Sequence, residues 1–209
     1  MKIHNNSTIL FQGDSITDCG RSRENNYDLG TGYANFISAW LNATYPERKI
    51  TFINRGISGN RVVDLVDRWD EDCIALKPDL VSILIGINDC WRRYDRNDPT
   101  SVQDFEENYR KILSHTKEKL NTKIILCEPF VLPVPDDRKQ WREDLDPKIQ
   151  VVRKLSLEFN TLYIPFDGIF ASACARREPV FWAEDGVHPT QAGHALMAKA
   201  WLDVVKEIS

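Results

Sequence analysis

Short apolar runs alternate along this chain with longer stretches of helical periodicity. The clearest run is LVSILI at residues 80–85, which Gly86 ends. Continuous apolar runs of this kind are typical of strands that are buried on both faces of a parallel sheet. The pattern predicts strands at residues 8–11, 50–53, 80–85, 123–127 and 162–165.

The stretches between these runs place apolar residues three or four positions apart, which is the spacing of one helix face. In one of them, Val62, Leu65 and Trp69 fall on a single stripe. We predict helices at residues 33–45, 62–76, 105–120, 146–159 and 190–208. Alternating strands and helices predict a three-layer α/β/α fold with a parallel sheet, formed by one domain over residues 1–209.

Two loop-rich stretches, residues 19–32 and 129–146, follow predicted strand ends. Open α/β sheets bind their ligands beyond the carboxyl ends of the strands. We therefore expect these stretches to form walls or a lid of a pocket, with ordinary surface loops as the alternative.

Composition and charge narrow the classes of protein and partner. A net charge of −4 over 209 residues gives no reason to expect nucleic-acid binding. No apolar run approaches the length of a membrane span. The five cysteines are widely spaced without a C-x-x-C pair, which favours reduced thiols over disulfides or a zinc site. Because the N-terminus shows no signal peptide, we expect a cytoplasmic protein. We also expect it to have no membrane partner, metal or cofactor.

Residues with catalytic chemistry follow the first predicted strand and recur near the end of the chain. Residues 13–18 read GDSITD, and residues 185–189 read DGVHP. A serine, an imidazole and a carboxylate are the parts of a nucleophilic acyl-transfer site, and they need to meet only in space. The sequence therefore predicts Ser15 as nucleophile, His188 as base and Asp185 as the acid that orients the imidazole.

Each of these signals has a plainer explanation when it stands alone. A serine in such a turn is more often a helix cap. The segment is also not the G-x-S-x-G elbow, because Thr17 stands where the second glycine would be. His188 and His194 are possible metal ligands, but no third matching ligand lies nearby in the sequence.

Two more polar segments follow the second and third predicted strands. Residues 54–60 read NRGISGN, where glycines expose backbone N–H groups that suit an anion or form a plain strand-to-helix turn. They do not match a phosphate-loop pattern. Residues 86–89 read GIND, and the side chain of Asn88 either donates to an oxyanion or forms an Asx turn.

Two tryptophans lie close to these segments in the sequence. Trp91 follows Asn88, and Trp182 precedes Asp185. An aromatic face near the site would stack on a sugar ring or wall off a small acyl pocket. Ordinary packing is the alternative for both residues.

Taken in this order, the four blocks resemble the SGNH hydrolase superfamily of GDSL-type esterases, whose blocks supply Ser, Gly, Asn and His. The resemblance implies a flavodoxin-like fold with a five-stranded parallel sheet. It also implies that Ser15 works with Asp185 and His188, and that Ser15, Gly59 and Asn88 form the oxyanion hole. The first block reads GDSI instead of GDSL. Isoleucine differs from leucine in the shape of its side chain but not in its polarity.

The sequence is similar to that of the intracellular acetylxylan esterases at residues 13–20, 30–33, 56–60 and 86–92. This closer resemblance implies an enzyme that deacetylates xylo-oligosaccharides or related sugars and assembles into homo-oligomers. A lysophospholipase or thioesterase of the same fold is one alternative. A ligand-binding α/β protein without catalysis is another, but it would leave the pairing of Asp185 with His188 unexplained.

Overall fold

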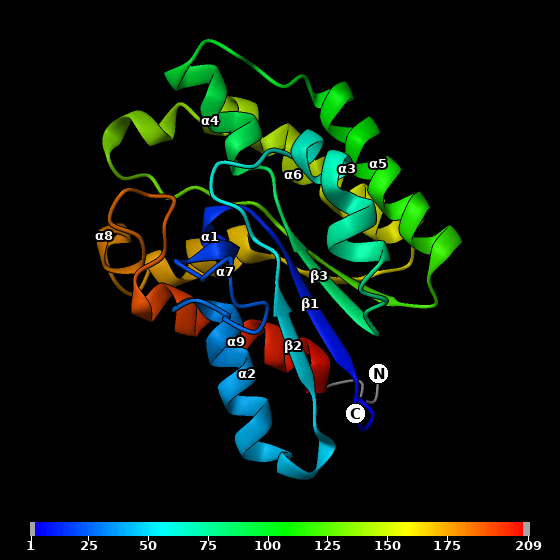
Figure 1. Ribbon diagram of the computed structural model, residues 1–209. Coiled ribbons are helices and arrows are strands. Elements are labelled where there is room, and N and C mark those ends of the chain that lie inside the picture. Colours follow the sequence, from blue (N-terminus) through cyan, green and yellow to red (C-terminus); the bar gives the residue numbers. More distant parts are fainter. Residues whose placement is uncertain (1–2, 207–209) are drawn as a thin grey trace.

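The computed structural model describes residues 3–206 and places a parallel sheet between two layers of helices (Figure 1). The strand order is β2-β1-β3-β4-β5, which is the flavodoxin-like order. The predicted α/β class and the five-stranded parallel sheet are confirmed. The strands are β1 (Thr8–Gly13), β2 (Thr51–Asn54), β3 (Leu80–Leu84), β4 (Lys123–Cys127) and β5 (Leu162–Ile164).

Strand β1 lies between β2 and β3, so the segments that follow these three strands start side by side. Phe11 is paired with Asn54 of β2 and with Ser82 of β3, and Gly13 is paired with Leu84. The carboxyl ends of the three strands therefore meet at one edge of the sheet. This register places the three polar segments that follow them next to one another.

Helices connect the strands and close the chain. They are α1 (Ser15–Asp18), α2 (Tyr33–Thr44), α3 (Val62–Trp69), α4 (Ile87–Asp95), α5 (Val102–Lys119), α6 (Arg142–Glu158), α7 (Phe166–Cys174), α8 (Pro179–Trp182) and α9 (Gln191–Lys206). Short irregular helical turns are η1 (Pro46–Arg48), η2 (Asp70–Ile74) and η3 (Asp136–Lys139).

Each face of the sheet has its own hydrophobic core. On one face α2, α7 and α9 pack against β1, where Phe11 contacts the buried ring of Trp201. On the other face lie α3, α5 and α6 (Figure 1). They cover Leu10, and Trp69 is the largest buried ring of this core. Because neighbouring strand residues point to opposite faces, the continuous apolar run of β1 supplies both cores.

The predicted helices are present, but several of their boundaries differ. Helix α6 begins before the predicted start at residue 146, and Pro147 lies inside it. A proline near a helix start is the commoner pattern, which is why the sequence suggested a later beginning. The predicted helix 62–76 divides into α3 and the π-helical turn η2. The last residues of the predicted helix 190–208 lie outside the described part of the chain.

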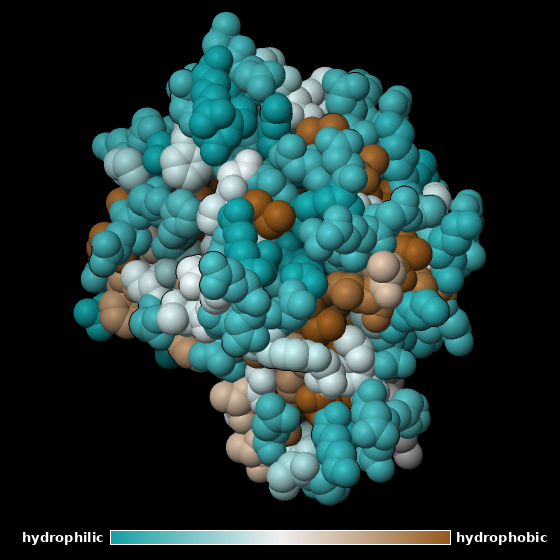
Figure 2. Space-filling view, viewed as in Figure 1, coloured by the Kyte–Doolittle hydropathy of each residue, from teal (hydrophilic) through white to brown (hydrophobic). Residues whose placement is uncertain are grey.

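The surface carries no broad apolar region on the face drawn in Figure 2, where hydrophilic residues dominate and hydrophobic ones form small separate patches. Within residues 3–206, none of the helices is both long and apolar enough to cross a membrane.

Candidate active site

Ser15, His188 and Asp185 lie together beyond the carboxyl end of β1. Oγ of Ser15 is 2.9 Å from Nε2 of His188. Nδ1 of the same imidazole is 2.6 Å from Oδ2 of Asp185. The structure thus brings the three residues into a chain of contacts with the spacing that proton transfer requires.

Asp14 positions Ser15. It is the N-cap of α1, and its Oδ1 accepts the N–H of Ile16 at 3.0 Å. Ser15 is the first residue of α1, so its own N–H belongs to the group that lacks an acceptor inside the helix. The cap is therefore Asp14, and the hydroxyl of Ser15 is left for His188. Burial raises the pKa of the Asp14 carboxyl to about 7.

Asp185 is held as a carboxylate by the loop that carries His188. Its Oδ1 accepts the backbone N–H groups of Val187 and His188 at 2.9 and 2.7 Å. Burial alone would raise the pKa of Asp185, but its hydrogen bonds from His188 and the backbone outweigh burial and lower it. The hydrogen bond to Asp185 raises the pKa of His188. Nδ1 therefore keeps its proton, and Nε2 is the nitrogen that faces Ser15 and can accept a proton.

Gly59 and Asn88 come from the segments after β2 and β3. Gly59 occupies an exposed turn with a φ of 86°, in the left-handed region. Asn88 lies in the first turn of α4 and is only 2% exposed. Its Nδ2 donates to the carbonyl of Asn60 at 3.1 Å, and its Oδ1 accepts from Arg92 at 3.1 Å. These bonds fix the amide and leave one N–H hydrogen for a further acceptor.

The segment before α6 contacts the backbone of the catalytic loop, residues 185–189, which the sequence did not indicate. Nε of Arg138 donates to the carbonyl of Asp185 at 3.2 Å. The N–H of Leu132 donates to the carbonyl of Gly186 at 2.8 Å. A Cβ atom on Gly186 would lie 2.1 Å from the carbonyl oxygen of Val134. The loop and its support are therefore in close contact.

Arg138 also belongs to an aromatic cluster beside the imidazole. Its guanidinium lies 4.0 Å from the ring centroid of Trp141 and 5.2 Å from that of Trp91. The ring of half-buried Trp91 lies 5.9 Å from that of His188. Trp91 thus lies near the catalytic residues, where the sequence predicted it.

Trp182 is not among the residues that line the cavity of His188. Its Nε1 donates to the carbonyl of Arg177 at 3.2 Å, and its ring lines a separate cavity with Ile169 and Leu196. The neighbouring Phe181 is the aromatic residue that lines the cavity of His188. The short distance in sequence between Trp182 and Asp185 indicated that this segment lies near the site. It did not indicate which of the two adjacent aromatic residues lines the cavity of His188.

The cavity beside His188 has a volume of about 900 Å³. Residues from the 19–32 loop, from α8 and from the start of α9 line it. Polar side chains on this lining include Thr31, Glu184 and Gln191. The predicted wall 19–32 therefore contributes to this cavity through Cys19 and Thr31.

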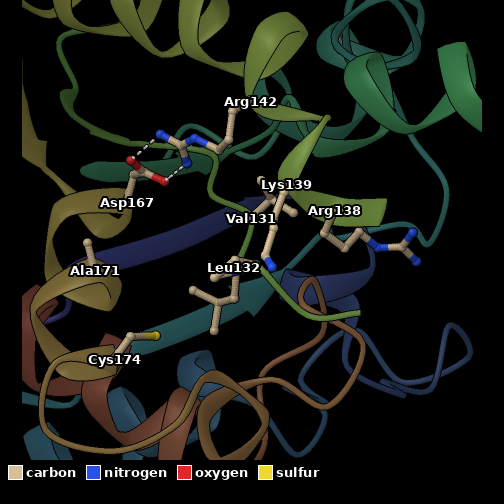
Figure 3. Close-up of a pocket in the computed structure, with 9 residues that line it drawn as sticks. Val131, Leu132, Arg138, Lys139, Arg142, Asp167, Ala171 and Cys174 are labelled. Carbon is tan, nitrogen blue, oxygen red and sulfur yellow. Dashed lines mark hydrogen bonds and ion pairs between the residues drawn. The ribbon is translucent and has the colours of Figure 1, made fainter. Parts of the chain in front are cut away.

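The 129–146 stretch borders a different cavity, of about 390 Å³, shown in Figure 3. Its apolar floor includes Leu132 and Ala171, and the guanidinium of Arg142 holds Asp167 through contacts of 2.5 and 2.9 Å. Ser15 and His188 do not line this cavity. The stretch acts on the catalytic loop by contact with its backbone, and its last residues already belong to α6.

His194 lies on α9 and serves as a hydrogen-bond partner. Its Nδ1 accepts the N–H of Tyr33 at 3.2 Å, and its Nε2 is 3.4 Å from Sγ of Cys19. Burial lowers the pKa of His194 to about 4, so the ring is neutral at physiological pH. In the part of the chain that the structure describes, no three His, Cys, Asp or Glu side chains are arranged to hold a metal ion.

The fold and the contacts among Ser15, His188 and Asp185 define a class of protein. Comparison with known families identifies this class. The model of the GDSL-like lipase/acylhydrolase family matches residues 11–196. The chain belongs to this family. The predicted resemblance and the enzyme class, a carboxylic ester hydrolase, are thereby confirmed.

Individual relatives are similar over nearly the whole chain. An acetylxylan esterase from Geobacillus stearothermophilus is 41% identical to this chain. The matched region covers 97% of this chain and 95% of the esterase. A crystal structure from Parabacteroides merdae, assigned to the GDSL-like lipases, has a TM-score of 0.92 at 41% identity and covers 97% of both chains. A catalytic mutant of the Geobacillus acetylxylan esterase has a TM-score of 0.90 at 39% identity, over 98% of this chain and 96% of that one.

Proposed function

We propose that this protein is a serine esterase that removes acetyl groups from sugars, with xylo-oligosaccharides as the preferred class of alcohol. The observation that carries the proposal is the contact chain from Oγ of Ser15 through the imidazole of His188 to the carboxylate of Asp185. A serine hydroxyl becomes a nucleophile only beside such a base.

In the acylation step, Oγ of Ser15 attacks the ester carbonyl carbon while Nε2 of His188 takes its proton. Asp185 stabilises the imidazolium that forms. The carbonyl oxygen becomes an oxyanion, which accepts hydrogen bonds from the N–H groups of Ser15 and Gly59 and from the amide of Asn88. Collapse of this intermediate breaks the bond to the alcohol oxygen, which leaves with the proton from His188.

In the deacylation step, water replaces the alcohol. His188 takes a proton from the water as its oxygen attacks the acyl-enzyme carbonyl, and the oxyanion forms again at the same donors. The intermediate then releases acetic acid, which ionises to acetate in water, and Oγ of Ser15 regains its proton from His188. The low pKa of Asp185 keeps the orienting carboxylate charged throughout.

The acetyl sugar as substrate is supported by two observations. The relative from Geobacillus stearothermophilus, 41% identical, is an acetylxylan esterase. The cavity beside His188, at about 900 Å³, is much larger than an acetyl group and is lined in part by Thr31, Glu184 and Gln191. A roomy site with polar side chains in its lining, beside the general acid, suits a sugar as leaving group.

The test compares hydrolysis of p-nitrophenyl acetate and p-nitrophenyl palmitate by the wild type and by the Ser15→Ala variant. We expect release from the acetate, loss of at least about a thousandfold in kcat in the variant, and an unchanged melting temperature. Acetylated xylo-oligosaccharides are then tested by measuring acetate release.

The other results have definite meanings. A preference for palmitate would show that the protein is a lysophospholipase or thioesterase and not a sugar deacetylase. Wild-type turnover in Ser15→Ala would remove Ser15 as nucleophile. If a serine-directed phosphonate fails to label the folded wild type, the proposal of a serine nucleophile fails.

A further inference from the structure

The turn that carries Gly59 has a backbone geometry on which the oxyanion hole depends. The N–H of Asn60 donates to the carbonyl of Ile57 at 3.1 Å, and Gly59 has a φ of 86°. These are the features of a type II turn with Gly59 at its third position. The N–H of Gly59 belongs to the central peptide, which the turn bond leaves free. In a type I turn this peptide is flipped, and the N–H points the other way.

Asp18 holds the residue that precedes Gly59. One oxygen, Oδ2, accepts both the backbone N–H and the hydroxyl of Ser58, each at 3.0 Å. The side chain of Asp18 is only 7% exposed. A buried carboxylate that receives two hydrogen bonds from one residue fixes that residue more strongly than a neutral acceptor does.

Asp18 also belongs to the helix that begins with the nucleophile. It is the last residue of α1, whose first residue is Ser15. The backbones of the two segments are in close contact, since a Cβ atom on Gly56 would lie 2.3 Å from the nitrogen of Asp18. The amide of Asn54 adds a bond of 2.6 Å to the carbonyl of Thr17. The helix and the turn are therefore joined at several points.

We propose that Asp18 is a positioning residue that sets the direction of the Gly59 N–H relative to Ser15. By accepting the backbone N–H and the hydroxyl of Ser58, the carboxylate stabilises the type II form of the turn in which Gly59 donates to the oxyanion. The ion pair of Asp18 with Arg23 contributes little to this role, because the two groups are 3.6 Å apart and Arg23 is 61% exposed. The inference rests on the proposed esterase function.

The experiment measures kcat and KM for p-nitrophenyl acetate in Asp18→Ala, Asp18→Asn and Ser58→Ala, with Arg23→Ala as the matched control. We expect Asp18→Ala to lower kcat about 10- to 100-fold while KM changes less than about threefold, because the lost contact matters mainly in the transition state. Asp18→Asn, which keeps an acceptor, restores part of the loss. Ser58→Ala keeps the backbone N–H and loses about three- to tenfold. Arg23→Ala leaves kcat unchanged.

A double-variant cycle separates positioning from a general structural role. In the Gly59→Ala background the turn already disfavours the required φ, so adding Asp18→Ala is expected to lower kcat by less than about twofold further. If the double variant instead loses kcat by the product of the two single-variant losses, the proposal is overturned. An Asp18→Ala variant that folds and keeps wild-type kcat would also overturn it. If Asp18→Ala does not fold, Ser58→Ala decides, and wild-type kcat in that variant overturns the proposal.

Labelling of Ser15 by a serine-directed phosphonate keeps the two hypotheses apart. A wild type that is labelled, together with an Asp18→Ala variant of unchanged kcat, would overturn the positioning role alone. A wild type that is not labelled would overturn the serine esterase and the positioning role with it.

Discussion

Replacing Asp14 with asparagine tests the protonation state of the carboxyl next to Ser15. Asp14 is 1% exposed, and its Oδ2 has no hydrogen-bond partner among residues 3–206. Asparagine can still cap α1, because its Oδ1 can accept the N–H of Ile16 as Asp14 does now. The variant therefore removes the titration of this site and preserves the cap.

The magnitude follows from the pKa of Asp14, which burial raises from 3.8 to about 7. Between these two pH values the folded protein keeps a proton that the unfolded chain has lost. Stability that Asp14 contributes at low pH is thus lost as the pH rises toward the folded pKa. The free energy of unfolding falls by about 1.4 kcal/mol for each pH unit, or about 4 kcal/mol over the range.

The assay is urea unfolding of the wild type and of Asp14→Asn at pH values from about 4 to 8. We expect the free energy of unfolding of the wild type to fall relative to that of the variant by about 4 kcal/mol over this range. Asp89, whose pKa burial also raises to about 7, is present in both proteins, so its direct contribution largely cancels in the difference. A difference that stays constant with pH would refute the reasoning and show that Asp14 ionises normally in the fold.

Three further substitutions test the geometry of the site. Asp185→Asn removes the hydrogen bond that raises the pKa of His188, so the acid limb of kcat/KM is expected to move to lower pH and kcat to fall; a limb that stays in place contradicts this account. Asn88→Ala is expected to lower kcat for p-nitrophenyl acetate by about 10²- to 10³-fold, and a loss below about threefold would exclude the amide as an oxyanion donor. Gly186→Ala places a Cβ atom 2.1 Å from the carbonyl oxygen of Val134, so the protein is expected to lose about 1–3 kcal/mol of stability; calorimetry showing an unchanged melting temperature would argue against that contact.

Much of the sheet could be predicted because buried parallel strands leave a direct trace in the sequence. The run at residues 80–85 and its counterparts are continuous and apolar, and each ends at a polar segment. The short helices left no such trace. Helix α4 starts at Ile87, directly after β3, and its first turn contains buried Asn88 and Asp89. Polar residues in a buried position break the periodicity that reveals a helix, so the helix escapes prediction.

The candidate site was predictable where residues follow strand ends, because the topology of a parallel sheet brings those ends together. Ser15 and Asn88 are of this kind. Arg138 and Phe181 are not, since their roles depend on how a loop and a short helix fold back onto the catalytic loop. Trp182 shows the limit of sequence distance, because it lines a cavity other than the one that His188 lines. The homo-oligomer and the cytoplasmic location stay predictions.

The contact between Ser15 and His188 joins residues that are 173 positions apart. Ser15 follows the first strand and His188 precedes the last helix, so an assembly that lacks either end of the chain lacks one of the two residues. Closing a loop of this length is favourable only after the intervening layers have packed. Recovery of esterase activity during refolding should therefore mark the final step of folding and lag behind the return of helical circular dichroism. The site can serve as a built-in reporter of complete folding.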